Sequence, residues 1–166
     1  MTLQYRDANT ADLPEIVRIY NSTVPGRMVT ADTEPVTTES RMAWFRAHEP
    51  LHRPLWMAEY EGKTVGWISY QSFYGRPAYQ ETAEISIYLD ENQRGRGYGR
   101  QMLQHAMDAC GSLGIKTLLG YIFAHNIPSM TLFTRLGFEP WGHLPRIARL
   151  DGIERDVIIA GKRINP

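Results

Sequence analysis

A turn rich in glycine and arginine is the part of the chain whose residues most clearly suggest chemistry. Gly95, Gly97 and Gly99 stand at alternate positions between an extended run and a helical pattern. The first backbone N–H groups of a helix lack partners and carry partial positive charge, so they attract phosphate. Glycines let the main chain approach an anion closely, and nearby arginines add fixed charge. The turn therefore predicts a pyrophosphate site. The arginines beside it are Arg94, Arg96 and Arg100.

Two better-known phosphate-binding loops do not fit this spacing. A dinucleotide fingerprint needs glycine where Arg100 stands and an acidic residue about 20 positions later. The sequence contains neither, and it contains no Gly-Lys-Ser or Gly-Lys-Thr phosphate loop. A glycine-rich turn between a strand and a helix is often only a tight turn. The flanking segments must therefore decide whether this turn binds phosphate.

A carboxylate precedes the turn on a strand-like segment. Glu84 shares one face of this segment with Ser86 and Tyr88, and the alternate residues are apolar. Partial burial disfavours the charged form of a carboxylate and makes it a stronger base. Such a base can take the proton of an alkyl ammonium, whose pKa is about 10.4 in lysine. The structural alternative is a Glu84 that pairs with an arginine or bonds to the main chain.

Hydrophobic periodicity and breakers predict the elements that position these residues. A strand, a crossover helix and a parallel strand place the turn at the carboxyl end of the first strand, where ligands usually dock. The sequence thus predicts an α/β domain with a mixed sheet over residues 1–166. The expected strands are 4–6, 55–61, 64–73, 83–89, 117–123, 138–143 and 154–160, and the expected helices are 12–21, 39–48, 99–113 and a short one from 126 or 127 to 136.

Composition limits the classes of function. With 166 residues, of which 43% are hydrophobic, the chain is long enough for one compact domain. Eighteen basic residues balance eighteen acidic ones, so no net charge recruits nucleic acid or an anionic membrane. Neither an apolar leader nor a bilayer-length run appears, which predicts a cytoplasmic protein. One cysteine, Cys110, and histidines without zinc spacing predict no metal site.

Several segments together resemble the GCN5-related N-acetyltransferase (GNAT) superfamily over about residues 55 to 140. They are Glu84 to Leu89, the turn Arg94 to Gly99, Asn126 to Ser129 and Leu136 to Phe138. The turn matches the acetyl-CoA signature Arg/Gln-x-x-Gly-x-Gly/Ala of that family. Short pieces at 19–21, 33–35, 69–70 and 83–84 resemble the phosphinothricin and methionine sulfoximine acetyltransferase group. The resemblance implies a sheet with a splayed parallel strand pair flanked by helices, and a homodimer.

The resemblance also implies roles for individual residues. Glu84 holds the position of the catalytic base, and Asn126 that of a contact to the pantetheine arm, although it also suits a helix cap. At the position of Phe133, relatives carry a tyrosine or histidine that can donate a proton to the departing thiolate, and phenylalanine cannot. Either another donor such as Tyr88 or Tyr121 acts instead, or the thiolate leaves without a donor. The expected acetyl-CoA contacts are Ile87, Tyr88, Leu89, Arg94, Gly95, Arg96, Gly97, Tyr98, Gly99, Arg100, Asn126 and Phe133.

The acceptor site carries the weaker signal. Tyr74 and Arg76 lie where relatives carry an Arg-Pro-Phe element, and a solvated loop arginine is an equal alternative. The expected substrate contacts are Tyr74, Arg76, Glu84, Ile85 and Ser86. These features predict an acetyl-CoA-dependent N-acetyltransferase of a small amine, an amino acid or an analogue, which reacts by direct attack in a ternary complex. The alternatives are a protein N-terminus, a lysine or a polyamine as acceptor, or a silent acyl-CoA-binding module.

Overall fold

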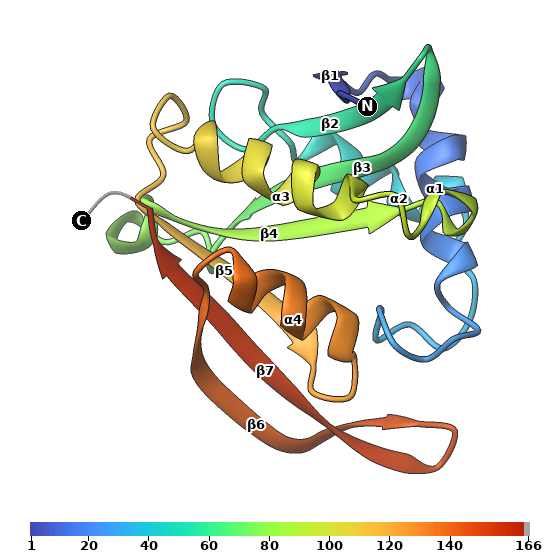
Figure 1. Ribbon diagram of the computed structural model, residues 1–166, viewed down its shortest axis with the longest axis vertical. Coiled ribbons are helices and arrows are strands. Elements are labelled where there is room, and N and C mark those ends of the chain that lie inside the picture. Colours follow the sequence, from blue (N-terminus) through green and yellow to red (C-terminus); the bar gives the residue numbers. More distant parts are fainter. Residues whose placement is uncertain (165–166) are drawn as a thin grey trace.

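A seven-stranded mixed sheet forms the centre of the molecule in the computed structural model, which describes residues 1–164 (Figure 1). The strand order is β1-β2-β3-β4-β5-β7-β6, and β4 and β5 are the parallel neighbours. The strands are β1 (Gln4–Asp7), β2 (Leu55–Tyr60), β3 (Lys63–Ser72), β4 (Thr82–Leu89), β5 (Thr117–Phe123), β6 (Glu139–Leu150) and β7 (Ile153–Arg163). The predicted α/β class with a mixed sheet is confirmed.

Helices cover both faces of the sheet, because alternate strand residues point to opposite sides. The helices are α1 (Leu13–Ser22), α2 (Thr38–Arg46), α3 (Tyr98–Asp108) and α4 (Ile127–Arg135). On β3, Ile68 belongs to the core that includes α3 and α4, whereas Trp67 belongs to the core under α1 and α2. Figure 1 shows α3 and α4 on the same face, with the β6–β7 hairpin extending beyond them.

The parallel pair β4 and β5 separates soon after it forms. Its ladder joins Thr82 to Thr117, Ala83 to Leu118 and Glu84 to Leu119, and then it ends. The remaining residues of β4 continue to pair with β3 as far as Leu89. One edge of β4 is therefore open from Glu84 to the strand end, which confirms the predicted splayed pair.

Several predicted boundaries were wrong. Helix α3 ends at Asp108 and not at residue 113, since Gly111 is a poor helix residue and the chain turns there. The β2–β3 turn centres on Glu61 and Gly62, whose φ values are 49° and 77°, and not on Gly62-Lys63. The last two strands are much longer than 138–143 and 154–160, because they continue as a protruding hairpin in which few residues are buried.

Two polar side chains next to or on the helices make contacts of their own. Asp12 does not cap α1 with its side chain. Its carboxylate instead accepts from the Asn9 N–H at 2.8 Å and pairs with Arg6 at 2.8 Å. His105 on α3 is half-buried and stacks on Tyr5 with ring centroids 3.7 Å apart.

Cys110, the single cysteine of the sequence, lies in the hydrophobic core. Cys110 is fully buried, and burial raises its thiol pKa to about 12, so it is an inert core residue. Within residues 1–164, each helix is too short or too polar to span a bilayer.

Candidate active site

The glycine turn ends in a helix start without a side-chain cap. Gly95 and Gly97 have φ values of 76° and 79°, which side chains rarely adopt. Gly97 is the N-cap of α3 and offers no side-chain acceptor, whereas Thr37 caps α2 and Asn126 caps α4. The first amides of α3 are consequently available to an anion.

A groove of about 860 Å³ runs from this turn across the open edge of β4 to the start of α4. Arg94 lines the groove, and Arg96 is exposed beside it. Arg100 lines a separate depression next to β1, and the Tyr98 side chain is buried in the core. The groove is lined by Ser22, Thr23, Pro25, Gly26, Met28, Val29, Ile87, Tyr88, Leu89, Glu91, Arg94, Gly95, Gly99, Asn126, Pro128, Ser129 and Leu132.

The groove leads into a smaller pocket where β4 and β5 diverge. This pocket of about 70 Å³ is lined by residues of both strands and of α4, including Glu84, Tyr121 and Phe133. The groove and the pocket share lining residues, so they adjoin each other. The shared residues are Val29, Ile87, Tyr88, Asn126 and Ser129. A long ligand anchored at the turn can therefore extend to Glu84.

The Glu84 carboxylate has the environment of a base. Its side chain is half-buried and, within residues 1–164, it forms no hydrogen bond or ion pair, so the structural alternative of an arginine partner is not realised. Burial raises the pKa of Glu84 above its ordinary value. Tyr121 lies close enough that its own pKa is raised by burial and by the Glu84 charge.

Asn126 has a structural task besides lining the groove. Its side chain accepts from the Ser129 N–H at 3.3 Å, which caps α4, and donates to the Met28 carbonyl at 3.0 Å. The neighbouring His125 ring lies 2.8 Å from the Arg27 carbonyl. Both side chains hold the loop after α1 against the end of β5, and this loop forms one wall of the groove.

The pocket wall contains one phenol that both reaches solvent and lies near Glu84. Phe133 is buried against Phe138 and cannot donate a proton. Tyr88 stacks on Trp67 with centroids 4.5 Å apart. Tyr121, by contrast, is 40% exposed and lines the pocket beside Glu84.

The loop between β3 and β4 places the predicted acceptor contacts at the mouth of the site. Tyr74 is 78% exposed and packs near Phe73, and its charge also affects the pKa of Tyr121. Arg76 is exposed and, in the described part of the chain, has no ion pair. Ile85 points to the α3 core, while Ser86 lies on the Glu84 face.

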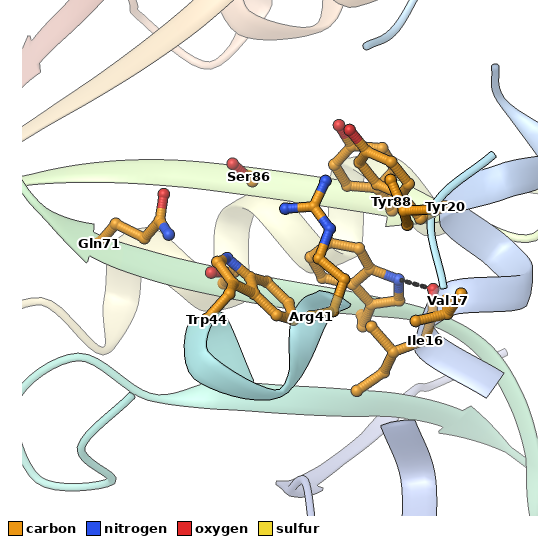
Figure 2. Close-up of a pocket in the computed structure, with 11 residues that line it drawn as sticks. Ile16, Val17, Tyr20, Arg41, Trp44, Gln71, Ser86 and Tyr88 are labelled. Carbon is orange, nitrogen blue, oxygen red and sulfur yellow. Dashed lines mark hydrogen bonds between the residues drawn. The ribbon is translucent and has the colours of Figure 1, made fainter. Parts of the chain in front are cut away.

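A further cavity was not predicted from the sequence. The aromatic pocket, of about 170 Å³, lies between α1, α2 and the sheet (Figure 2). Its distinctive residues come from segments far apart in the chain and are Tyr20, Arg41, Trp44, Trp67 and Tyr88. The pair Arg41 and Trp44 on one predicted helix could have indicated this pocket. The amphipathic pattern of α2 is weak, however, so the sequence did not show which of its residues face the sheet.

Comparison with known proteins identifies the family. A model of the acetyltransferase (GNAT) family matches residues 13–138. YwnH of Bacillus subtilis (strain 168), provisionally named a phosphinothricin acetyltransferase, is 52% identical over 166 residues, with 99% of this chain and 100% of YwnH covered. The L-methionine sulfoximine/L-methionine sulfone acetyltransferase of Pseudomonas paraeruginosa is 32% identical over 167 residues, with 100% and 97% covered.

A solved structure of a relative contains the acetyl donor, acetyl-CoA. The phosphinothricin acetyltransferase from Sinorhizobium meliloti in complex with acetyl-CoA superposes with a TM-score of 0.91 at 29% identity, and the match covers 98% of this chain and 89% of that one. The family uses acetyl-CoA, and the groove and turn fit a long diphosphate-bearing donor. The chain belongs to the GNAT acetyltransferase family and is an acetyl-CoA-dependent N-acetyltransferase.

Proposed function

We propose that this enzyme acetylates the primary amine of a small amino acid or analogue of the phosphinothricin or methionine sulfoximine type. The observation that carries the proposal is the adjoining groove and pocket, which lead from the uncapped start of α3 to the Glu84 carboxylate, a group with no ion-pair partner within residues 1–164. The names of the relatives support the acceptor class. The small volume of the pocket beside Glu84 suits a small amine better than a protein chain.

We propose that the donor is held mainly by main-chain groups. The amides of Gly97 to Gly99 and the charges of Arg94 and Arg96 bind the diphosphate, whereas Arg100, which lines the depression next to β1, adds only a more distant positive charge. Since alternate N–H groups of a strand point to opposite edges, part of Ile87 to Leu89 faces the open edge of β4 and binds the pantetheine arm. Asn126 and Phe133 border the acyl end.

Acetyl-CoA supplies an activated thioester, and the chain supplies the proton transfers. Glu84 accepts a proton from the acceptor ammonium, directly or through water, which frees the nitrogen lone pair for attack. A β4 main-chain N–H donates to the oxyanion that develops on the carbonyl oxygen. The amine nitrogen adds to the carbonyl carbon to form the tetrahedral intermediate. Its collapse breaks the C–S bond while Tyr121 donates its proton to the departing sulfur, and the excess proton of the new amide nitrogen passes to the Tyr121 phenolate, directly or through water. No acyl-enzyme is formed.

The exposed loop residues Tyr74 and Arg76 are proposed to contact the acceptor close to its amine. Tyr74 lies near Tyr121, which in turn lies near Glu84. Arg76 provides a positive charge for the carboxylate next to the reacting amine. The Ser86 side chain and the main chain of Ile85, both on β4, complete this end of the acceptor site.

An acetylation screen tests the function. We expect CoA release with phosphinothricin, L-methionine sulfoximine and L-methionine sulfone, and not with polyamines or N-terminal peptides. Glu84→Gln is expected to lower kcat roughly 100-fold or more while the acetyl-CoA dissociation constant stays within about twofold. Full activity of Glu84→Gln would exclude the base assignment, and a screen with no active amino acid would exclude the acceptor class.

We further propose that residues 1–166 form one catalytic domain that works in the cytoplasm as a homodimer. One sheet connects both ends of the described chain, which supports a single domain. Exposed apolar side chains on the hairpin support self-association, namely Trp141 at 48%, Ile147 at 59% and Ile153 at 52% exposure. Light scattering on the purified enzyme distinguishes a dimer from a monomer.

A further inference from the structure

The aromatic pocket adjoins the proposed site of transfer. Ser86 and Tyr88 line both this pocket and the pocket that contains Glu84. Gln71, the β3 neighbour of Glu84 in the ladder, also lines the aromatic pocket. A molecule whose amine lies at Glu84 can therefore place its other end in the aromatic pocket.

The walls of this pocket are mostly aromatic. Trp44 meets Trp67 edge to face with centroids 5.4 Å apart, and Trp67 stacks on Tyr88 at 4.5 Å. With about 170 Å³, the pocket is smaller than the roughly 300–1,000 Å³ typical of drug-sized ligands. It thus suits one end of a small metabolite that carries an apolar group.

Arg41 supplies the positive charge among these rings. Its guanidinium carbon lies 4.7 Å from the centre of the Tyr20 ring and 5.9 Å from that of Trp44. Figure 2 shows its guanidinium reaching from α2 toward β4, between Trp44 and the pair of Tyr20 and Tyr88. The Arg41 side chain is 26% exposed, so part of it is shielded from water.

Most hydrogen-bond donors of Arg41 remain available. A guanidinium has five N–H donors. Asp32 accepts from one terminal nitrogen at 2.9 Å, and within residues 1–164 Arg41 has no other hydrogen-bond partner. The Tyr20 hydroxyl also contacts the Asp32 carboxylate, so this acid is itself held in place. Asp32 therefore orients Arg41 and leaves its other edge free for oxygen atoms of a ligand.

The span between Glu84 and this pocket fits a specific kind of acceptor. Residues along a strand rise about 3.3 Å each, so Ser86 lies roughly 6.6 Å along β4 from Glu84. In an extended α-amino acid, an atom four bonds from the amine lies roughly 5 Å away, given bonds of about 1.5 Å. Phosphinothricin and methionine sulfone carry phosphorus or sulfur at this position, with oxygens and a methyl group attached.

From these distances and donors, we propose that Arg41 binds the oxygen atoms at the far end of the acceptor side chain, while the surrounding rings pack against its methyl group. Arg41 is thus a specificity-determining residue that favours sulfonyl, sulfoximine and phosphinyl amino acids over a thioether of the same length. This inference rests on the proposed function and refines its acceptor class. The α-carboxylate stays near Glu84, at the end of the acceptor site opposite to Arg41.

Two acceptors that differ only in two oxygens test the inference. Arg41→Met keeps an unbranched side chain and removes the donors, so the ratio of kcat/KM for L-methionine sulfone over L-methionine is expected to fall roughly 10- to 100-fold. Arg41→Lys keeps the charge without the planar fork and should give an intermediate ratio. Arg46→Met, on an exposed position of α2 outside the aromatic pocket, is the matched control and should retain the wild-type ratio.

Binding measured without turnover separates the role of Arg41 from the proposed function. Trp44 and Trp67 line the pocket, so tryptophan fluorescence reports acceptor binding. Tighter binding of the sulfone than of methionine, lost in Arg41→Met, supports the inference. Equal loss for both acceptors, or an equal effect of Arg46→Met, overturns it. If the wild type acetylates no amino acid, the proposed function fails, and the fluorescence comparison still decides the role of Arg41.

Discussion

At the scale of single residues, Glu84 combines a burial that raises its pKa with the absence of an ion-pair partner in residues 1–164. A folded-state pKa above the unfolded value of about 4.5 means that folding favours the protonated form. The stability contributed by Glu84 is therefore present below pH 4.5 and is lost as the pH rises through the folded pKa. Once the pH lies above the folded pKa, ionisation of Glu84 costs the fold stability.

Glu84→Gln is accordingly expected to stabilise the enzyme while it removes activity. We expect Tm at pH 7.5 to rise by roughly 2–4 °C. The difference from the wild type should shrink as the pH falls toward 4.5, since both side chains are then neutral. Calorimetry across this pH range measures the effect, and a lower Tm for the variant at pH 7.5 would contradict it.

Tyr121 allows a second test at the residue scale. If its phenol protonates the departing thiolate, Tyr121→Phe lowers kcat about tenfold or more and leaves the acetyl-CoA KM within about twofold. The ring is retained, so packing in the pocket changes little. Steady-state kinetics with a fixed acceptor are sufficient. An unchanged kcat would mean that the thiolate leaves without a specific donor.

At the scale of elements, the turn before α3 depends on its backbone conformation. Ala at position 97 meets no atom within 4 Å, but the φ of 79° strains any residue other than glycine. Gly97→Ala is expected to cost about 1 kcal/mol of stability and to weaken acetyl-CoA binding roughly tenfold, as measured by calorimetric titration.

A matched glycine controls for the strain itself. Gly114 has a φ of 70° and is equally open, but it lies after α3 and outside the groove. Gly114→Ala should lose similar stability and keep the wild-type acetyl-CoA dissociation constant. If both variants bind acetyl-CoA equally weakly, general destabilisation explains the effect and the turn has no special role.

The strand, the glycine turn and the following helix were predictable because their signals are local. Alternation over 83–89 and the spacing of Leu103, Ala106 and Met107 depend on neighbouring residues only. The end of α3 was not predictable from its apolar spacing, which continues to Leu113, because the helix stops where the chain must turn toward β5. Local patterns thus predicted element types better than their ends.

At the scale of the whole molecule, two half-buried histidines couple stability to pH. Burial lowers the pKa of His48 and of His105 below the ordinary 6.5. The His48 ring lies between the Ser69 hydroxyl at 2.7 Å and the Trp44 carbonyl at 3.0 Å. A depressed folded pKa contributes stability that is present above pH 6.5 and is lost as the pH falls through the folded pKa.

The expected outcome is a fall in Tm as the pH decreases from about 7 to 5, through protonation of these rings. His48→Gln should reduce this slope. The exposed His52→Gln is the control and should keep it. Thermal melts in matched buffers measure both, and identical slopes for His48→Gln and the wild type would remove His48 from the explanation.

The tertiary arrangement explains why the aromatic pocket escaped prediction. Tyr20 on α1, Trp44 on α2 and Trp67 on β3 meet only after both helices pack on the sheet. Their separations along the chain carry no periodic signal. Glu84 and the turn, by contrast, lie in neighbouring segments of the sequence, so this part of the candidate site could be proposed from local patterns, and the aromatic pocket could not.

The three-rung ladder between β4 and β5 has a consequence for how the protein responds to its donor. Beyond Glu84, part of the β4 backbone has no strand partner on one side among residues 1–164, so these amides should exchange their hydrogens with deuterated water quickly in the empty enzyme. A pantetheine chain that lies along this edge takes the position of an absent neighbouring strand. Addition of CoA should slow exchange at Ile87 to Leu89 far more than at Thr82 to Glu84, which the fifth strand already protects.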